Sequence, residues 1–244
     1  MKKPPITFTE WNHTYTHNET GEKFTSVTTI LGKYKKPFDS DGAATRVAKR
    51  EGVSKEMVLE MWEKEKNKAC DRGTSLHKLL EDYITVGEQV DDYGWLYKTY
   101  DRCAEYNVDR YKKVLCEQLL WNEELKVSGL ADLIYEHKDG TFTVGDFKTN
   151  KRYRFSSDYN EWMLPPLDHL TVCEHSTYTM QLSIYAWLYE QLTGKKCRKL
   201  VIYYLKGDRF VAHHGNYMKA EVENLLKDFN AAREAAELEV SIKK

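Results

Sequence analysis

The sequence lacks the features that mark secreted proteins, membrane proteins and proteins that bind iron–sulfur clusters. Its five cysteines are odd in number and include no C-x-x-C pair, which predicts reduced thiols in an intracellular protein and no iron–sulfur cluster. The N-terminal segment MKKPPITFTEW has no apolar signal region, and no stretch approaches the ~18 apolar residues of a membrane span. We therefore expect a soluble cytoplasmic protein that does not enter membranes.

The sequence also lacks an excess of charge of one sign. Its 37 Lys and Arg residues nearly balance 38 Asp and Glu residues, which argues against a polycation that binds nucleic acid over its whole surface and leaves room for a local basic groove. No internal repeat or low-complexity tract divides the 244 residues. The length and a hydrophobic fraction of 41% predict one domain with a sizeable core.

Residue periodicity predicts the elements of the N-terminal half. Alternation of polar with aromatic or β-branched residues over 6–31 predicts a β-hairpin that turns at Gly21. Apolar residues three and four positions apart predict three helices, with a break between the first two near Gly73. These helices cover residues 54–70, 74–85 and 92–111.

The C-terminal half reads as strands followed by further helices. Three short β-rich segments predict a meander over 114–121, 126–136 and 142–147. An irregular insertion over 150–176 precedes a helix over 178–192 that ends at Gly194, a hairpin over 200–205 and 209–213, and a helix over 218–238. We therefore expect a mixed α/β fold, with a central mixed β-sheet flanked by helices and an N-terminal β-hairpin.

As a single domain, residues 1–244 divide into four predicted regions. They are a β-hairpin region (1–35), a helical region (36–112), a catalytic core with the insertion at 150–176 (113–217) and a C-terminal helix (218–244).

Chemistry concentrates in the meander, where Asp132 lies in one apolar strand and Asp146 and Lys148 lie in the next. Side chains alternate across a strand, so Asp146 and Lys148 share a face while Phe147 points the other way. Converging carboxylates repel each other unless a cation lies between them, and Mg²⁺ prefers oxygen ligands of this kind. A nearby lysine that polarises water and stabilises charge at phosphorus suits phosphodiester hydrolysis.

Taken alone, a D-x-K pattern more often marks a solvent-facing pair. The apolar surroundings and the glycines Gly129 and Gly145 distinguish these positions from exposed strand residues.

Four motifs in order carry a resemblance to a known family: Gly73-Thr74-Ser75-Leu76-His77, Gly129-Leu130-Ala131-Asp132, Asp146-Phe147-Lys148 and Gln181-Leu182-Ser183-Ile184-Tyr185. This order resembles the PD-(D/E)XK nuclease superfamily, and within it the RecB-like branch of phage and mitochondrial single-strand exonucleases. The segment from Ser26 to Leu31 also resembles the N-terminal segment of those exonucleases. The resemblance implies a restriction-endonuclease-like core.

The resemblance further implies a role for each motif residue. His77, Asp132, Asp146 and the backbone carbonyl of Phe147 would bind Mg²⁺, for which Mn²⁺ would substitute. Lys148 would be the catalytic lysine. Gln181 and Tyr185, four residues apart on one helix face, would be the supporting pair.

Two of the candidate residues have plain structural alternatives. His77 could be an ordinary histidine of an amphipathic helix, although Gly73 permits a turn and Thr74 can cap a helix that carries the imidazole. Glu117 resembles an acidic position on the first core strand of such nucleases, where it would either support the metal ligands or serve only the fold.

A basic run interleaved with aromatics follows the catalytic lysine. Cations there can meet phosphates while Tyr153 and Phe155 stack on bases, and the alternative is a solvated basic loop. The predicted nucleic-acid contacts are Thr149, Lys151, Arg152, Tyr153 and Arg154.

The sequence thus predicts a Mg²⁺-dependent DNA exonuclease that acts on free ends and prefers single strands. No base-reading motif, zinc finger or helix-turn-helix pattern is present, which favours recognition of strand structure and ends over sequence. A setting in DNA replication, recombination or repair, with a phage gene acting in the host cytoplasm, follows from the resemblance alone. The alternatives are a duplex-specific recombination exonuclease of the same superfamily, a catalytically silent DNA-binding module, and an adaptor whose C-terminal helix binds a partner.

Overall fold

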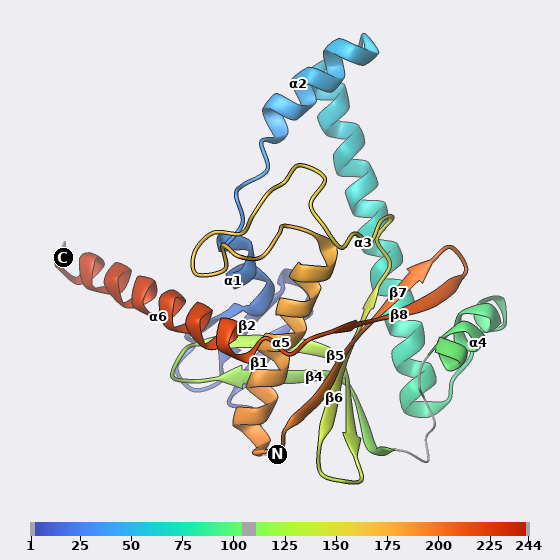
Figure 1. Ribbon diagram of the computed structural model, residues 1–244, viewed down its shortest axis with the longest axis vertical. Coiled ribbons are helices and arrows are strands. Elements are labelled where there is room, and N and C mark those ends of the chain that lie inside the picture. The colour runs from blue at the N-terminus through green and yellow to red at the C-terminus, as the bar shows by residue number, and fades with distance from the viewer. Residues whose placement is uncertain (1–2, 104–110, 243–244) are drawn as a thin grey trace.

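The computed structural model describes residues 3–103 and 111–242, whose strands form a mixed sheet with helices on both faces (Figure 1). At the N-terminus, β1 (Ile6–Thr9) pairs antiparallel with β2 (Thr14–His17), and β2 pairs antiparallel with β3 (Lys23–Ser26). A 3₁₀ turn, η1 (Glu10–Asn12), joins the first two strands. Gly21, with φ 71°, lies between β2 and β3, so the hairpin predicted at this glycine is present.

The predicted meander forms the centre of the sheet. It consists of β4 (Tyr111–Asn122), β5 (Val127–His137) and β6 (Phe142–Lys148), paired antiparallel in that order. β3 runs parallel to the start of β5, and β7 (Cys197–Lys206) runs parallel to β6. β8 (Arg209–Gly215) then pairs antiparallel with β7. This combination of pairings confirms the mixed α/β fold.

Helices cover both faces of the sheet. On one face α1 (Val27–Lys33), α5 (Glu174–Thr193) and α6 (Lys219–Ile242) contribute to the larger hydrophobic core. On the other face α3 (Lys55–Val86) and α4 (Gly94–Cys103) contribute to a second core, and a short 3₁₀ turn, η2 (Asp91–Tyr93), connects them. No helix within the described ranges is long and apolar enough to cross a membrane.

α2 (Ser40–Glu51) packs against the first half of α3, and the two project beyond the sheet as a helical arm (Figure 1). The arm has a small core of its own, formed by Ala44, Ala48 and Val58. Residues 63–72 of α3, between this core and the sheet, are all exposed. The arm is therefore joined to the body through a length of α3 whose side chains are exposed and through the segment that precedes α2.

The prediction of two helices broken near Gly73 is wrong, because α3 is continuous through this glycine. The N-cap of α3 is Ser54, whose hydroxyl accepts a hydrogen bond from the Met57 amide. Thr74 therefore lies in the interior of this helix and does not cap it. A Cβ at position 73 would lie 3.3 Å from Thr149 Oγ1. The glycine thus permits the close approach of the chain that follows β6, and it does not end a helix.

The strand pattern predicted over residues 6–31 ends earlier than expected. Residues 27–33 form α1, which begins where the Ser26 hydroxyl accepts a hydrogen bond from the Thr29 amide. The helix predicted over 92–111 is present as α4, residues 104–110 lie outside the described ranges, and Tyr111 already belongs to β4. The helix predicted to end at Gly194 is α5, with Gly194 at φ 70° in its C-cap. The predicted second hairpin and C-terminal helix are β7, β8 and α6.

Candidate metal centre

The D-x-K motif lies on β6, and its alternation is as the sequence predicts. Asp146 and Lys148 share a face, where the lysine Nζ lies 2.6 Å from Asp146 Oδ2, while Phe147 packs in the core beneath α3 and α4. Asp146 is only 1% exposed. Neither of its carboxylate oxygens has a hydrogen-bond partner of good geometry, so the ion pair with Lys148 is the main compensation for its burial.

Beside this pair, three potential metal ligands converge from three elements. His77 comes from α3, Glu117 from β4 and Asp132 from β5, and one ligand atom of each lies within 4.8 Å of the others. We call this group the His77 cluster. Within it, His77 Nδ1 lies 3.3 Å from Asp132 Oδ2, and the Phe147 amide donates a 2.9 Å hydrogen bond to the same oxygen. This hydrogen bond joins the cluster to the strand that carries Asp146.

The cluster lies where the alternation of two strands is interrupted. Ala131 packs in the core beneath α5, but Leu133, which regular alternation would put on the same face, packs beneath α3 and α4. Opposite Asp132 in the ladder, between the pairs Cys116–Leu133 and Gln118–Ala131, Glu117 has a left-handed φ of 45°. Such a conformation costs roughly 1–3 kcal/mol in a residue with a side chain and clusters at functional sites.

The site holds more negative charge than its own cations neutralise. Burial, followed by the repulsion from Asp132 and other carboxylates, raises the pKa of Glu117 to about 8. Burial also raises the pKa of Asp146 to about 6, although Lys148 opposes this rise. Carboxyl groups whose pKa values rise in this way favour a proton or a bound cation.

Lys148 stays protonated in this environment. Burial alone would lower the pKa of its ammonium group, but the charges of Asp146 and Asp132 raise it above the ordinary value. The ammonium also lies 4.8 Å from the centroid of the Tyr178 ring, a cation–π contact from α5. The Tyr178 hydroxyl in turn donates a 3.2 Å hydrogen bond to the side chain of Asn150.

Tyr178 is a site residue that the sequence reasoning missed. Its signal was its position three residues before Gln181, which puts both on one face of α5. Gln181 and Tyr185 are both buried and are joined by a 3.1 Å hydrogen bond from Gln181 Nε2 to the tyrosine hydroxyl. A Cβ at Gly129 would lie 2.5 Å from the Tyr185 ring, so this glycine allows α5 to approach β5.

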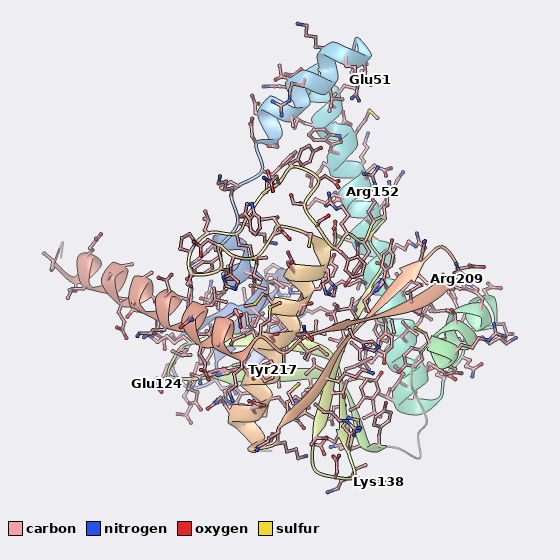
Figure 2. The ribbon with its side chains drawn as sticks, in the orientation of Figure 1. Glu51, Glu124, Lys138, Arg152, Arg209 and Tyr217 are labelled. Carbon is pink, nitrogen blue, oxygen red and sulfur yellow. The ribbon has the colours of Figure 1, made fainter. Side chains whose placement is uncertain are left out.

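The predicted nucleic-acid contacts lie in a lid, residues 149–172, that follows β6. Lys151 and Arg152 are exposed, and Figure 2 shows Arg152 beside α3. Arg154 is held by Glu174 and Asp158. Tyr153 stacks on His213 at a centroid distance of 4.2 Å, and its hydroxyl forms a hydrogen bond with His175. Its ring is therefore already engaged in contacts within the protein.

Comparisons with known proteins give only distant likenesses. No family model and no curated protein matches the sequence. A solved structure described as SSO0001 has 17% identity and a TM-score of 0.37, and the match covers 84% of this chain and 74% of that one. A "Putative exonuclease" from Eubacterium rectale has 13% identity and a TM-score of 0.36, with coverage of 84% and 68%. At these scores neither likeness carries an argument.

Proposed function

We propose that the protein is a Mg²⁺-dependent DNA nuclease of the PD-(D/E)XK superfamily that hydrolyses phosphodiester bonds at the D-x-K motif. One observation carries the proposal: Asp146 is a buried carboxylate with no hydrogen-bond partner of good geometry, and it lies against the partly buried Lys148 and beside the His77 cluster. A structural ion pair needs neither the adjoining carboxylates nor the left-handed Glu117 that brings one of them in.

The residues present suit a divalent cation. The ligands would come from His77, Glu117, Asp132 and Asp146, with the Phe147 carbonyl that the resemblance implies. Carboxylate oxygens predominate in this set, which favours Mg²⁺ and admits Mn²⁺. When bound, the cation supplies charge that polarises the phosphate and lowers the pKa of a bound water.

The protein's own groups perform the remaining steps. The Lys148 ammonium donates hydrogen bonds to the attacking water or to a phosphate oxygen and stabilises the negative charge that develops at phosphorus. Asp146 and the Tyr178 ring hold this ammonium from two sides. Because Asp146 is buried and Tyr178 packs against the core, the lysine enters the reaction with its orientation fixed.

The lid supports action at strand ends. The Leu164 amide donates a 2.8 Å hydrogen bond to the Tyr34 carbonyl, and Lys151 Nζ lies 2.7 Å from a Glu65 carboxylate oxygen. The lid therefore bridges α1 and the arm, and we propose that this bridge restricts a continuous duplex more than a strand end. We assign the enzyme to exonucleolytic DNA processing in replication, recombination or repair, with single strands as its preferred substrate, and we place a phage-encoded enzyme of this kind in the host cytoplasm.

The deciding experiment measures degradation of end-labelled single-stranded, duplex and circular DNA with Mg²⁺ or with EDTA. We expect Mg²⁺-dependent loss of linear single strands, abolished in Lys148→Ala and Asp146→Asn. Lys138→Ala is the matched control, since Lys138 is exposed and lies at the far end of the β5–β6 hairpin from Arg152 (Figure 2). Full metal-dependent cleavage by both site variants would refute the proposal.

The same experiment separates the alternatives. Degradation of duplex ends in preference to single strands would identify a recombination exonuclease. Binding of DNA without cleavage under any condition would identify a silent binding module.

A further inference from the structure

Most of the exposed aromatic side chains among the described residues belong to two segments of the chain, the lid and the linker. Of the six aromatic residues that are large, apolar and exposed among the described residues, four belong to the lid and to the linker that precedes α2, residues 34–39. These are Phe38 (74% exposed), Phe155 (60%), Tyr159 (81%) and Trp162 (45%). The other two, Trp11 and Trp95, lie on η1 and α4. Grouping of this kind marks a binding surface more often than scattered exposure does.

The lid and linker form a continuous surface. The hydrogen bond from the Leu164 amide to the Tyr34 carbonyl joins the two segments, and Figure 1 shows them running side by side between α1 and the arm. Phe38 also reaches the arm, where its ring centroid lies 6.3 Å from that of Trp62. We call the four exposed rings the aromatic surface.

The lid has a folded structure of its own, so its aromatic rings are exposed even though apolar residues of the same segment are buried in the core. Met163 and Leu167 of the lid are buried in the core with α1 and α5. Trp162, next to Met163 in sequence, forms a bridge with Thr171 and still leaves its ring 45% exposed. The chain therefore buries some apolar lid residues and presents others to solvent.

Exposed charges of both signs accompany these rings. Lys36, Lys151 and Arg152 are exposed on the linker and at the start of the lid, directly after the lysine of the D-x-K motif, and Asp158 and Glu161 are exposed farther along the lid. A polyanion that leaves the metal centre along the lid would meet cations and flat apolar rings together. Single-stranded nucleic acid offers this combination, because its phosphates are charged and its bases are unpaired.

We propose that the aromatic surface binds the bases of an unpaired DNA strand by stacking, and that it gives the enzyme its preference for single strands. This inference rests on the proposed function, and it moves the base contacts from Tyr153, whose ring already stacks on His213, to Tyr159, Trp162 and their neighbours. A duplex offers no free base faces along its length, so the surface distinguishes the two substrates without reading sequence.

The test measures binding of fluorescent oligothymidylate and of an abasic strand of equal length. The full chain carries Asp146→Asn to prevent cleavage, and EDTA is present. We expect Tyr159→Ala and Trp162→Ala each to weaken binding of oligothymidylate by roughly five-fold or more, with little effect on the abasic strand. Tyr159→Phe retains a stacking ring and should bind as the parent does. Trp95→Ala is the control for loss of an exposed aromatic ring elsewhere.

A salt titration separates stacking from charge. The ring variants should keep the parent's salt dependence, whereas Lys151→Ala should reduce its slope by about 0.7 if this lysine contacts one phosphate. Unchanged affinity for oligothymidylate in both ring variants would overturn the inference, and so would an equal loss on the abasic strand. Failure of the proposed function would be seen separately, as absence of Mg²⁺-dependent cleavage by the unsubstituted protein.

Discussion

Metal binding by the His77 cluster should depend steeply on pH, and Glu117 should cause most of this dependence. A carboxyl group must lose its proton before it can bind a cation. With a pKa of about 8, Glu117 is about 1% ionised at pH 6 and about half ionised at pH 8. Asp146, whose pKa burial raises to about 6, contributes a smaller change over the same range.

The dissociation constant for Mg²⁺ should therefore fall by about 50-fold between pH 6 and pH 8, on the basis of Glu117 alone. Isothermal titration calorimetry of the unsubstituted protein and of Glu117→Gln measures this change directly. In Glu117→Gln the affinity should be lower at pH 8 and nearly independent of pH apart from the contribution of Asp146. Glu124→Gln is the control, because Glu124 is exposed in the turn after β4.

Stability without metal should vary in the opposite sense. Because the folded-state pKa of Glu117 lies above its ordinary value of 4.5, the folded state binds this proton more tightly than the unfolded state. Its favourable contribution is present below about pH 4.5 and is lost as pH rises to about 8. In EDTA, Glu117→Gln should thus gain stability relative to the parent over this range, as measured by urea unfolding. A Mg²⁺ affinity in the parent that is the same at pH 6 and pH 8 would refute the reasoning.

Three further substitutions test the packing around the site. Gly73→Ala should change the melting temperature little, because the gain of about 1 kcal/mol in helix propensity is opposed by the tight contact of the new Cβ with Thr149 Oγ1 at 3.3 Å; a large rise in the melting temperature would contradict this. Gly129→Ala should destabilise the fold by about 1–3 kcal/mol, since its Cβ would lie 2.5 Å from the Tyr185 ring. A urea midpoint in this variant equal to that of the parent would exclude the clash. Tyr178→Leu should lower kcat by roughly 3- to 30-fold through loss of the cation–π contact, while Tyr178→Phe keeps the ring and most of the rate; equal kcat in both variants would refute the positioning role.

The elements that the sequence predicts well are those whose apolar residues are large enough for their spacing to show which face is buried. The meander of β4, β5 and β6 has long apolar runs with turn residues between them, and α5 ends at a glycine whose positive φ a C-cap requires. α2 escaped prediction because its buried residues are Ala44 and Ala48, which are too small to stand out as an apolar face. A helix held by such small contacts depends on the neighbouring helix, which no local pattern describes.

The sequence motifs name most residues of the candidate site, with Tyr178 as the exception, but they do not give its geometry. Regular alternation puts Asp146 and Lys148 on one face, and the structure has them there. Alternation could not reveal the reversal between Ala131 and Leu133, because that reversal depends on the left-handed backbone of Glu117 in the neighbouring strand. The role of Gly73 could not be predicted for the same reason, because it depends on the close approach of Thr149, which is far along the chain.

The unbroken helix α3 also restricts how the chain can tolerate changes in length. Since each residue of an α-helix advances about 100° around the axis, inserting or deleting one residue within 63–72 would swing the whole arm about that axis while His77 stayed with the sheet. When the change lies between Glu65 and His77, Glu65 would then face away from Lys151 of the lid. Only changes close to a whole number of turns, such as about seven or eleven residues, keep both ends in phase, so homologous chains should differ in arm length by such steps and not by single residues.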